Sequence, residues 1–148
     1  MAESPATPQA IVGQMMANDA FSQWLGIEVL TVDAGHVTLR MTVRDEMTNG
    51  FGIGHGGILY ALADSALAFA SNGYGQVALA LENVMHYTEP ARVGDVVLAT
   101  ATERSRTRRI GVYDVALQRE DGTDLALFRG TVYITARLHE AASSETKT

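Results

Sequence analysis

The chain has 148 residues, of which 17 are acidic and 11 are basic, so its formal net charge at pH 7 is −6 with histidine counted neutral. Hydrophobic residues make up 47% of the chain and charged residues 19%, which predicts one domain with a core and excludes a disordered chain. The acidic balance offers no general positive field, so we expect no nucleic-acid partner. No apolar run approaches about 18 residues, so we expect no membrane span.

The sequence contains no cysteine, which excludes disulfides, a thiolate nucleophile and zinc sites with sulfur ligands. The four histidines show no metal-ligand spacing, so we expect no metal site. Residues 1–9 contain two prolines, an acid and no apolar stretch, which argues against a secretory signal and favours a cytoplasmic protein. We expect residues 1–9 to be a flexible N-terminus, residues 10–138 to form the domain, and residues 139–148 to be a disordered tail.

Helices are predicted first, followed by a hairpin. Between residues 10 and 25, apolar side chains recur at mixed helical spacing with an interruption at Asn18 and Asp19, which predicts one or two short amphipathic helices. Apolar and polar residues alternate over residues 37–43 after a turn at residues 33–35, which predicts the second strand of a hairpin.

The rest of the chain predicts one helix and four strands. A glycine-rich loop at residues 49–57 precedes an alanine- and leucine-rich run at residues 58–70, which is typical of a buried helix. Segments rich in β-branched residues follow, separated by turn signals, and we expect consecutive strands to be antiparallel neighbours. These segments are residues 77–87, 96–102, 110–118 and 125–137. The order predicts an α+β domain with a curved antiparallel sheet around one long helix.

Asp64 lies well inside this apolar helix. Aspartate is a poor helix former in a helix interior, and Asp64 lies too far from the helix start to act as a cap. A charged aspartate that is buried without partners lowers the stability of the fold by several kcal/mol. We favour a general base or nucleophile whose environment tunes it. The alternative is a structural carboxylate that faces a polar seam or pairs with an arginine such as Arg109 or Arg129.

The start of the same helix offers a second piece of chemistry. Residues 54–57 read Gly-His-Gly-Gly, so a ligand oxygen can approach the unpaired first-turn N–H groups and the positive end of the helix dipole. This suits an oxyanion, and no Gly-Lys-Ser or Gly-Lys-Thr follows to make a phosphate-binding loop. Gly56 and Asp64 lie roughly 12 Å apart along one helix, too far for one carbonyl to reach both. A joint role therefore demands two antiparallel copies of the helix in a twofold homodimer, with the site at the interface.

The chain carries five motifs in order: Asn49-Gly50, residues 55–64, residues 87–90, Gly94-Asp95 and residues 111–114. Together they resemble the hotdog-fold acyl-CoA thioesterases, above all the PaaI-type branch associated with phenylacetate degradation, over roughly residues 10–137. The resemblance implies a hotdog fold and dimers that pair into tetramers. It also implies hydrolysis of an acyl-CoA thioester, with no cofactor because CoA is part of the substrate.

The resemblance also assigns catalytic roles. Gly56 would supply the N–H that holds the thioester oxygen, and His55 and Asn49 would line and orient that site. Asp64 from the second subunit would attack the carbonyl or activate water. The residues alone allow plainer interpretations, since His55 can be a loop histidine bonded to backbone and an Asn-Gly pair such as that at Asn49 is a common turn former.

One position departs from the family pattern. Some relatives carry a serine or threonine that holds the water, and the position that aligns with it here is Ala80. Ser65 is the nearby substitute that we expect to take this role.

An arginine cluster forms the only basic patch of this acidic chain. Strand alternation predicts that Arg104, Arg106 and Arg108 project to one side, where guanidinium groups can grip the phosphates of coenzyme A. The alternative is a solvated hairpin end. The patch has no interleaved aromatic residues, which disfavours a nucleic-acid surface.

The favoured function is hydrolysis of an acyl-CoA thioester, with an aryl, phenylacetyl or hydroxyphenylacetyl group, while a medium-chain acyl group stays open. The alternative is a non-catalytic acyl-CoA sensor on the same fold, which would need no ionised Asp64. Hotdog dehydratases pair a histidine after a different loop with a glutamate on the helix, so Asp64 after His-Gly-Gly favours hydrolysis.

Overall fold

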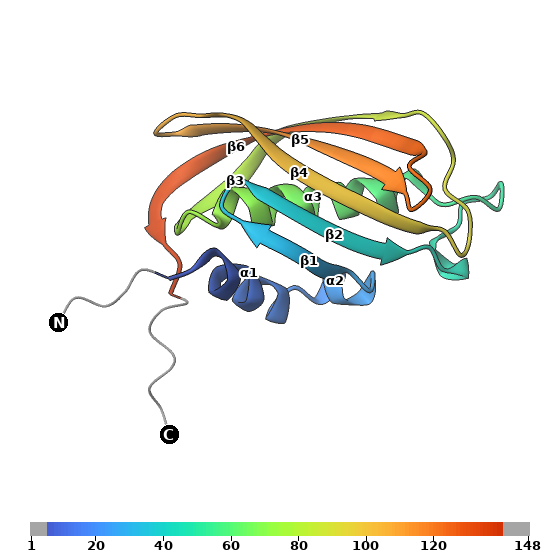
Figure 1. Ribbon diagram of the computed structural model, residues 1–148, viewed down its shortest axis with the longest axis horizontal. Coiled ribbons are helices and arrows are strands. Elements are labelled where there is room, and N and C mark those ends of the chain that lie inside the picture. The colour runs from blue at the N-terminus through green and yellow to red at the C-terminus, as the bar shows by residue number, and fades with distance from the viewer. Residues whose placement is uncertain (1–5, 141–148) are drawn as a thin grey trace, which may run out of the picture.

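The computed structural model describes residues 6–140 as a curved sheet packed over a long helix (Figure 1). Two short helices come first, α1 (Pro8–Ala17) and α2 (Ala20–Trp24), followed by a hairpin of β1 (Glu28–Asp33) and β2 (His36–Thr42). A 3-10 helix, η1 (Asp45–Met47), leads into the glycine-rich loop and α3 (Gly56–Asn72). The last four elements are β3 (Gln76–Tyr87), β4 (Val96–Arg106), β5 (Ile110–Arg119) and β6 (Asp124–Leu138).

The six strands form one antiparallel sheet with the order β1-β2-β4-β5-β6-β3. The α+β class and the predicted helices and strands are confirmed. The expectation that every strand neighbours the next is wrong for β3, which pairs with β6 instead of β4. The connection over residues 88–95 is longer than the two to five residues typical of a hairpin, and it carries the chain across the sheet. As a result, β1 and β3 are the two edge strands.

The core lies between α3 and the concave face of the sheet. Leu62, Ala66 and Leu67 of α3 are at most 1% exposed, and alternate residues of β4, among them Ala99 and Ala101, are fully buried opposite them. Helix and sheet approach closely at Gly130 of β6, where an added Cβ would lie 2.5 Å from Leu67 Cδ2. Small side chains on the sheet therefore allow the helix to sit inside the curve.

The ends of the domain differ from the predicted boundaries. Thr7 caps α1 by accepting a hydrogen bond from the Ala10 N–H at 3.1 Å, so Pro8 and Gln9, predicted to be flexible, are helical. His139 belongs to the fold and not to a tail, because its N–H donates to the Gly75 carbonyl at 2.9 Å. Residues 1–5 and 141–148 of the predicted flexible ends lie outside the described residues. Within residues 6–140, no helix is long and apolar enough to cross a membrane.

Candidate active site

Gly56 and Asp64, the predicted oxyanion donor and the predicted acid, line separate cavities of the same chain. A cavity of about 290 Å3 at the start of α3 is lined by Gly56 together with Asn49 and Tyr87. A second cavity, of about 270 Å3, lies between α3 and β3 and is lined by Asp64 and Ala80. Because α3 is one continuous helix from Gly56 to Asn72, the groups stay about 12 Å apart within one chain.

The first turn of α3 leaves one N–H group available in the first cavity. His55 is the N-cap, and its Nδ1 accepts a hydrogen bond from the Gly57 N–H at 2.8 Å. His55 is therefore bonded to backbone, as the plainer interpretation predicted, and the hydrogen of its neutral ring lies on Nε2. The Gly56 N–H has no acceptor among the described residues, so it is the donor that a ligand oxygen can use.

Tyr87 holds Gly56 in place from β3. Its hydroxyl donates to the Gly56 carbonyl at 2.9 Å, and burial raises the pKa of that hydroxyl. A Cβ added at Gly56 would lie 3.1 Å from Tyr87 Cζ, tighter than ordinary contact. Tyr87 was not predicted as a site residue, although it opens the motif at residues 87–90 that carries part of the resemblance.

Asn49 closes the glycine-rich loop and also lines the cavity at the start of α3. Its Oδ1 accepts hydrogen bonds from the Phe51 N–H at 2.9 Å and the Ile53 N–H at 3.4 Å, which closes the turn. Its side-chain amide nitrogen has no acceptor among the described residues. Asn49 therefore shapes the loop and still presents a donor to the cavity that Gly56 lines.

Asp64 is half-buried and has no cationic partner among the described residues. The Asn83 Nδ2 group donates to Asp64 Oδ1 at 3.0 Å and to the Tyr60 hydroxyl oxygen at 3.0 Å. Burial raises the pKa of Asp64, the hydrogen bond from Asn83 partly opposes this, and the negative charge of Asp19 raises the pKa further. Sequence reasoning missed Asn83, because nothing in the alternation of β3 separates it from an ordinary polar strand residue.

The arginines proposed as structural partners of Asp64 lie elsewhere. Arg129 binds Asp114 at 2.6 Å, and the guanidinium of Arg109 lies over the Tyr133 ring at 6.0 Å. The interpretation of Asp64 as an arginine-paired structural carboxylate is therefore wrong for both arginines.

Ser65 faces α2 and not the Asp64 cavity. The Ser22 hydroxyl donates to Asp19 Oδ2 at 2.7 Å, so the 2.8 Å hydrogen bond between Ser22 and Ser65 uses the hydrogen of Ser65. Ser65 lines neither cavity, whereas Ala80, the departure from the family pattern, lines the Asp64 cavity. The hydrogen bond from Ser65 to Ser22 therefore links α3 to α2.

The predicted arginine patch is divided between two faces of the sheet. Arg104 binds Asp114 Oδ2 at 2.8 Å, while Arg106 stacks over the Tyr74 ring at 3.9 Å. The prediction of one shared side is wrong because β4 has an irregularity between Glu103 and Ser105 that breaks the alternation. Arg108 lies in the turn after β4, is exposed, and forms no ion pair within residues 6–140.

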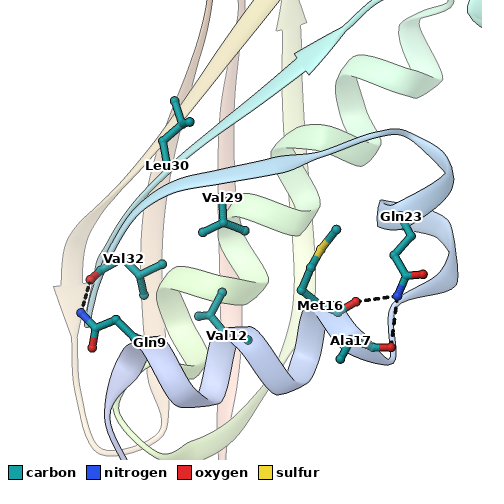
Figure 2. Close-up of a pocket in the computed structure, with 9 residues that line it drawn as sticks. Gln9, Val12, Met16, Ala17, Gln23, Val29, Leu30 and Val32 are labelled. Carbon is teal, nitrogen blue, oxygen red and sulfur yellow. Dashed lines mark hydrogen bonds between the residues drawn. The ribbon is translucent and has the colours of Figure 1, made fainter.

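A cavity of about 600 Å3 between α1, α2 and β1 carries no reaction chemistry (Figure 2). Gln9 donates to the Val32 carbonyl at 2.8 Å, and Gln23 donates to the carbonyls of Met16 and Ala17 at 2.9 and 3.1 Å. The other labelled lining residues are aliphatic: Val12, Val29 and Leu30. Nowhere in residues 6–140 do three or more acidic, histidine or cysteine side chains meet in a group that could hold a metal ion.

A curved sheet over one long helix, a free N–H at the helix start and an acid in its middle define the class of hotdog-fold thioester hydrolases. The chain belongs to the thioesterase superfamily, whose family model matches residues 51–126. It is 39% identical over 116 residues to the acyl-coenzyme A thioesterase PaaI of Escherichia coli (strain K12), which is 78% of this chain and 83% of that relative. The predicted resemblance to PaaI-type hotdog thioesterases is confirmed.

Two solved structures support the same assignment. The structure of the E. coli PaaI protein from the phenylacetic acid degradation operon has a TM-score of 0.86 and 33% identity, covering 90% of this chain and 99% of that one. A mutant of the phenylacetic acid degradation protein PaaI from Thermus thermophilus has a TM-score of 0.75 and 43% identity, covering 78% of this chain and 98% of that one.

Proposed function

We propose that this chain hydrolyses acyl-CoA thioesters to a free acid and CoA, with phenylacetyl or hydroxyphenylacetyl groups as the favoured substrates. The observation that carries the proposal is that one helix holds two groups suited to this reaction: within residues 6–140, the Gly56 N–H has no acceptor and the half-buried Asp64 has no cationic partner. A donor fixed at a helix start stabilises the negative charge that develops on a thioester oxygen. A carboxylate with a raised pKa in an apolar setting suits base or nucleophilic catalysis.

In the proposed reaction, the thioester oxygen accepts a hydrogen bond from the Gly56 N–H of one subunit. Asp64 of the other subunit either takes a proton from a water that attacks the carbonyl carbon or attacks that carbon itself. When water attacks, the bond from carbon to sulfur breaks, the CoA sulfur leaves with the electron pair, and the proton that Asp64 took from the water passes to that sulfur. When Asp64 attacks, the CoA sulfur leaves in the same way and a mixed anhydride with Asp64 remains. Water then hydrolyses this anhydride to the free acid, which restores the Asp64 carboxylate and supplies the proton that the CoA sulfur takes up. The Asn83 amide keeps one carboxylate oxygen of Asp64 in place and leaves the other without a partner among residues 6–140.

The proposal includes a homodimer formed through the free edge of β3. This strand has 12 residues and exposes Leu79 (58%) and Leu81 (61%), which is unusual for an edge strand that stays in water. Antiparallel pairing of two β3 strands would continue the sheet and place the two copies of α3 side by side in opposite directions. The pairing of dimers into tetramers stays a prediction from the resemblance.

Binding of the CoA phosphates is proposed for Arg106 and Arg108. Arg104 is already bound to Asp114, which also accepts a hydrogen bond from Arg129. The hydrogen bond from Arg129, and after it the one from Arg104, lowers the pKa of the Asp114 carboxyl group. Arg108 is exposed and Arg106 has no ion pair within the described residues, so both have donors to offer to phosphate. The cytoplasmic location and the absence of nucleic-acid, membrane and cofactor partners stay predictions from the sequence.

The test is thiol release from phenylacetyl-CoA, 4-hydroxyphenylacetyl-CoA and straight-chain acyl-CoA esters, with wild type and Asp64→Asn side by side. We expect wild-type turnover on at least one aromatic ester and a loss of at least about a hundredfold in the variant. Tight ester binding without thiol release would instead favour the acyl-CoA sensor. Wild-type turnover in Asp64→Asn would refute the proposed mechanism.

A further inference from the structure

The Asp64 cavity continues along α3 to a polar end. Asp64, Leu67, Ala68 and Ser71 all line it, and their spacing places them on one stripe of the helix. The walls beyond Asp64 are apolar, formed by Leu67 and Ala68 together with residues of β3 and β6. Ser71, Asn72 and His139 supply its polar groups at the far end.

Asn72 fixes the hydrogen-bonding state of His139. The Asn72 Nδ2 group donates to the carbonyls of Ala68 at 2.8 Å and Ala78 at 3.1 Å, so the amide orientation is determined. Its Oδ1 accepts from the Ala78 N–H at 2.9 Å and lies 2.7 Å from His139 Nε2. Since Oδ1 only accepts, Nε2 must carry the hydrogen, and Nδ1 of the neutral ring is left as an acceptor.

Ser71 adds a second acceptor beside it. The Ser71 side chain is 3% exposed, and its hydroxyl hydrogen is used in a 3.3 Å bond to the Ala68 carbonyl. The lone pairs of its oxygen remain available. The end of the cavity therefore offers hydrogen-bond acceptors and no free donor from these two side chains.

We propose that Ser71 and His139 determine specificity by accepting a hydrogen bond from a hydroxyl at the far end of the acyl group, as in a 4-hydroxyphenylacetyl ester. This inference rests on the proposed hydrolysis. Ser71 lies seven positions after Asp64 along the helix, a rise of about 10.5 Å. A 4-hydroxyphenylacetyl group spans roughly 6.5 Å from carbonyl carbon to phenolic oxygen, and a hydrogen bond adds about 2.8 Å. The acyl group and this hydrogen bond together span about 9.3 Å, which is close to the separation of Asp64 and Ser71 along the helix.

The test compares kcat/KM for 4-hydroxyphenylacetyl-CoA and phenylacetyl-CoA in wild type, His139→Phe and Ser71→Ala. His36→Phe, at an exposed position of β2, is the matched control. We expect wild type to prefer the hydroxylated ester, and each cavity variant to lower that preference about three- to tenfold with little change on phenylacetyl-CoA. The control should keep the wild-type preference.

An unchanged preference in the cavity variants, or a loss shared equally by both esters, would overturn the inference. If His139→Phe does not fold, Ser71→Ala decides alone by the same criteria, because it removes only one oxygen. Failure of wild type to hydrolyse either ester would refute the proposed function instead, so the two failures are distinguishable.

Discussion

Replacing Gly56 by proline deletes the proposed oxyanion donor with little other change to the backbone. Gly56 is the first residue of α3, where proline is well tolerated because that N–H has no helical acceptor. His55 before it has φ −64° and ψ 133°, the extended conformation that a residue before proline favours. Loss of one such donor costs about 10²- to 10³-fold in kcat, or about 2.7 to 4 kcal/mol.

The matched control is Gly56→Ala, which keeps the N–H. Its Cβ would lie 3.1 Å from Tyr87 Cζ, and the Tyr87 side chain is 53% exposed, so the ring can move outward by a few tenths of an ångström. We therefore expect a loss in kcat of less than about tenfold for alanine and of at least about a hundredfold for proline. Thiol-release kinetics and thermal unfolding of both variants provide the assay. Equal activity of folded proline and alanine variants would refute the role of the Gly56 N–H.

Four further variants test the acid, its hydrogen-bond partner, the phosphate contact and the dimer. The pKa of Asp64 is raised in the folded protein, so ionised Asp64 lowers the free energy of unfolding at pH values above that raised pKa. Asp64→Asn should therefore raise the Tm at pH 7. This increase in Tm should vanish below pH 3.8, the ordinary carboxyl pKa, where Asp64 is protonated in both the folded and the unfolded chain. Asn83→Ala removes a bond that lowers this pKa, so the acidic limb of the kcat/KM profile should move to higher pH, and an unmoved limb would contradict the assignment. Arg108→Ala should raise KM for acyl-CoA about three- to tenfold with little change in kcat, and an unchanged KM would remove it from the site. Leu81→Glu should be a monomer by light scattering and inactive in the thiol-release assay, whereas Leu30→Glu on the other edge strand should stay dimeric. A dimeric Leu81→Glu variant would contradict pairing through β3.

Much of the fold follows from local patterns in the sequence. The alternation over residues 37–43 and the apolar run over residues 58–70 predict β2 and α3, because burial of one face or all faces dictates their period. The neighbour of β3 was not predictable in this way. Its pairing with β6 depends on which edge of the sheet is free after the eight-residue connection, and this is a property of the whole fold.

Some residues of the candidate site were likewise predictable from local sequence, and others were not. Asp64 and Gly56 stand out in the sequence because an acid inside an apolar helix and a glycine at its start both break local rules. Asn83 and Tyr87 obey the ordinary pattern of a strand, and only the packing of β3 against α3 brings them to Asp64 and Gly56. The arginines were misplaced because an irregularity in β4 changes which face Arg106 occupies, and no local signal marks it.

Mixing two inactive variants shows whether each site combines Gly56 of one subunit with Asp64 of the other. Gly56→Pro and Asp64→Asn chains would be unfolded together, refolded at equal concentrations and assayed for thiol release. In a heterodimer of the two, one site carries both changes and the other carries neither. When half of the dimers are mixed, we expect recovery of about a quarter of wild-type activity, because one of the two sites in each mixed dimer is intact. A mixture that exchanges subunits but stays as inactive as the separate variants would contradict a site shared between subunits.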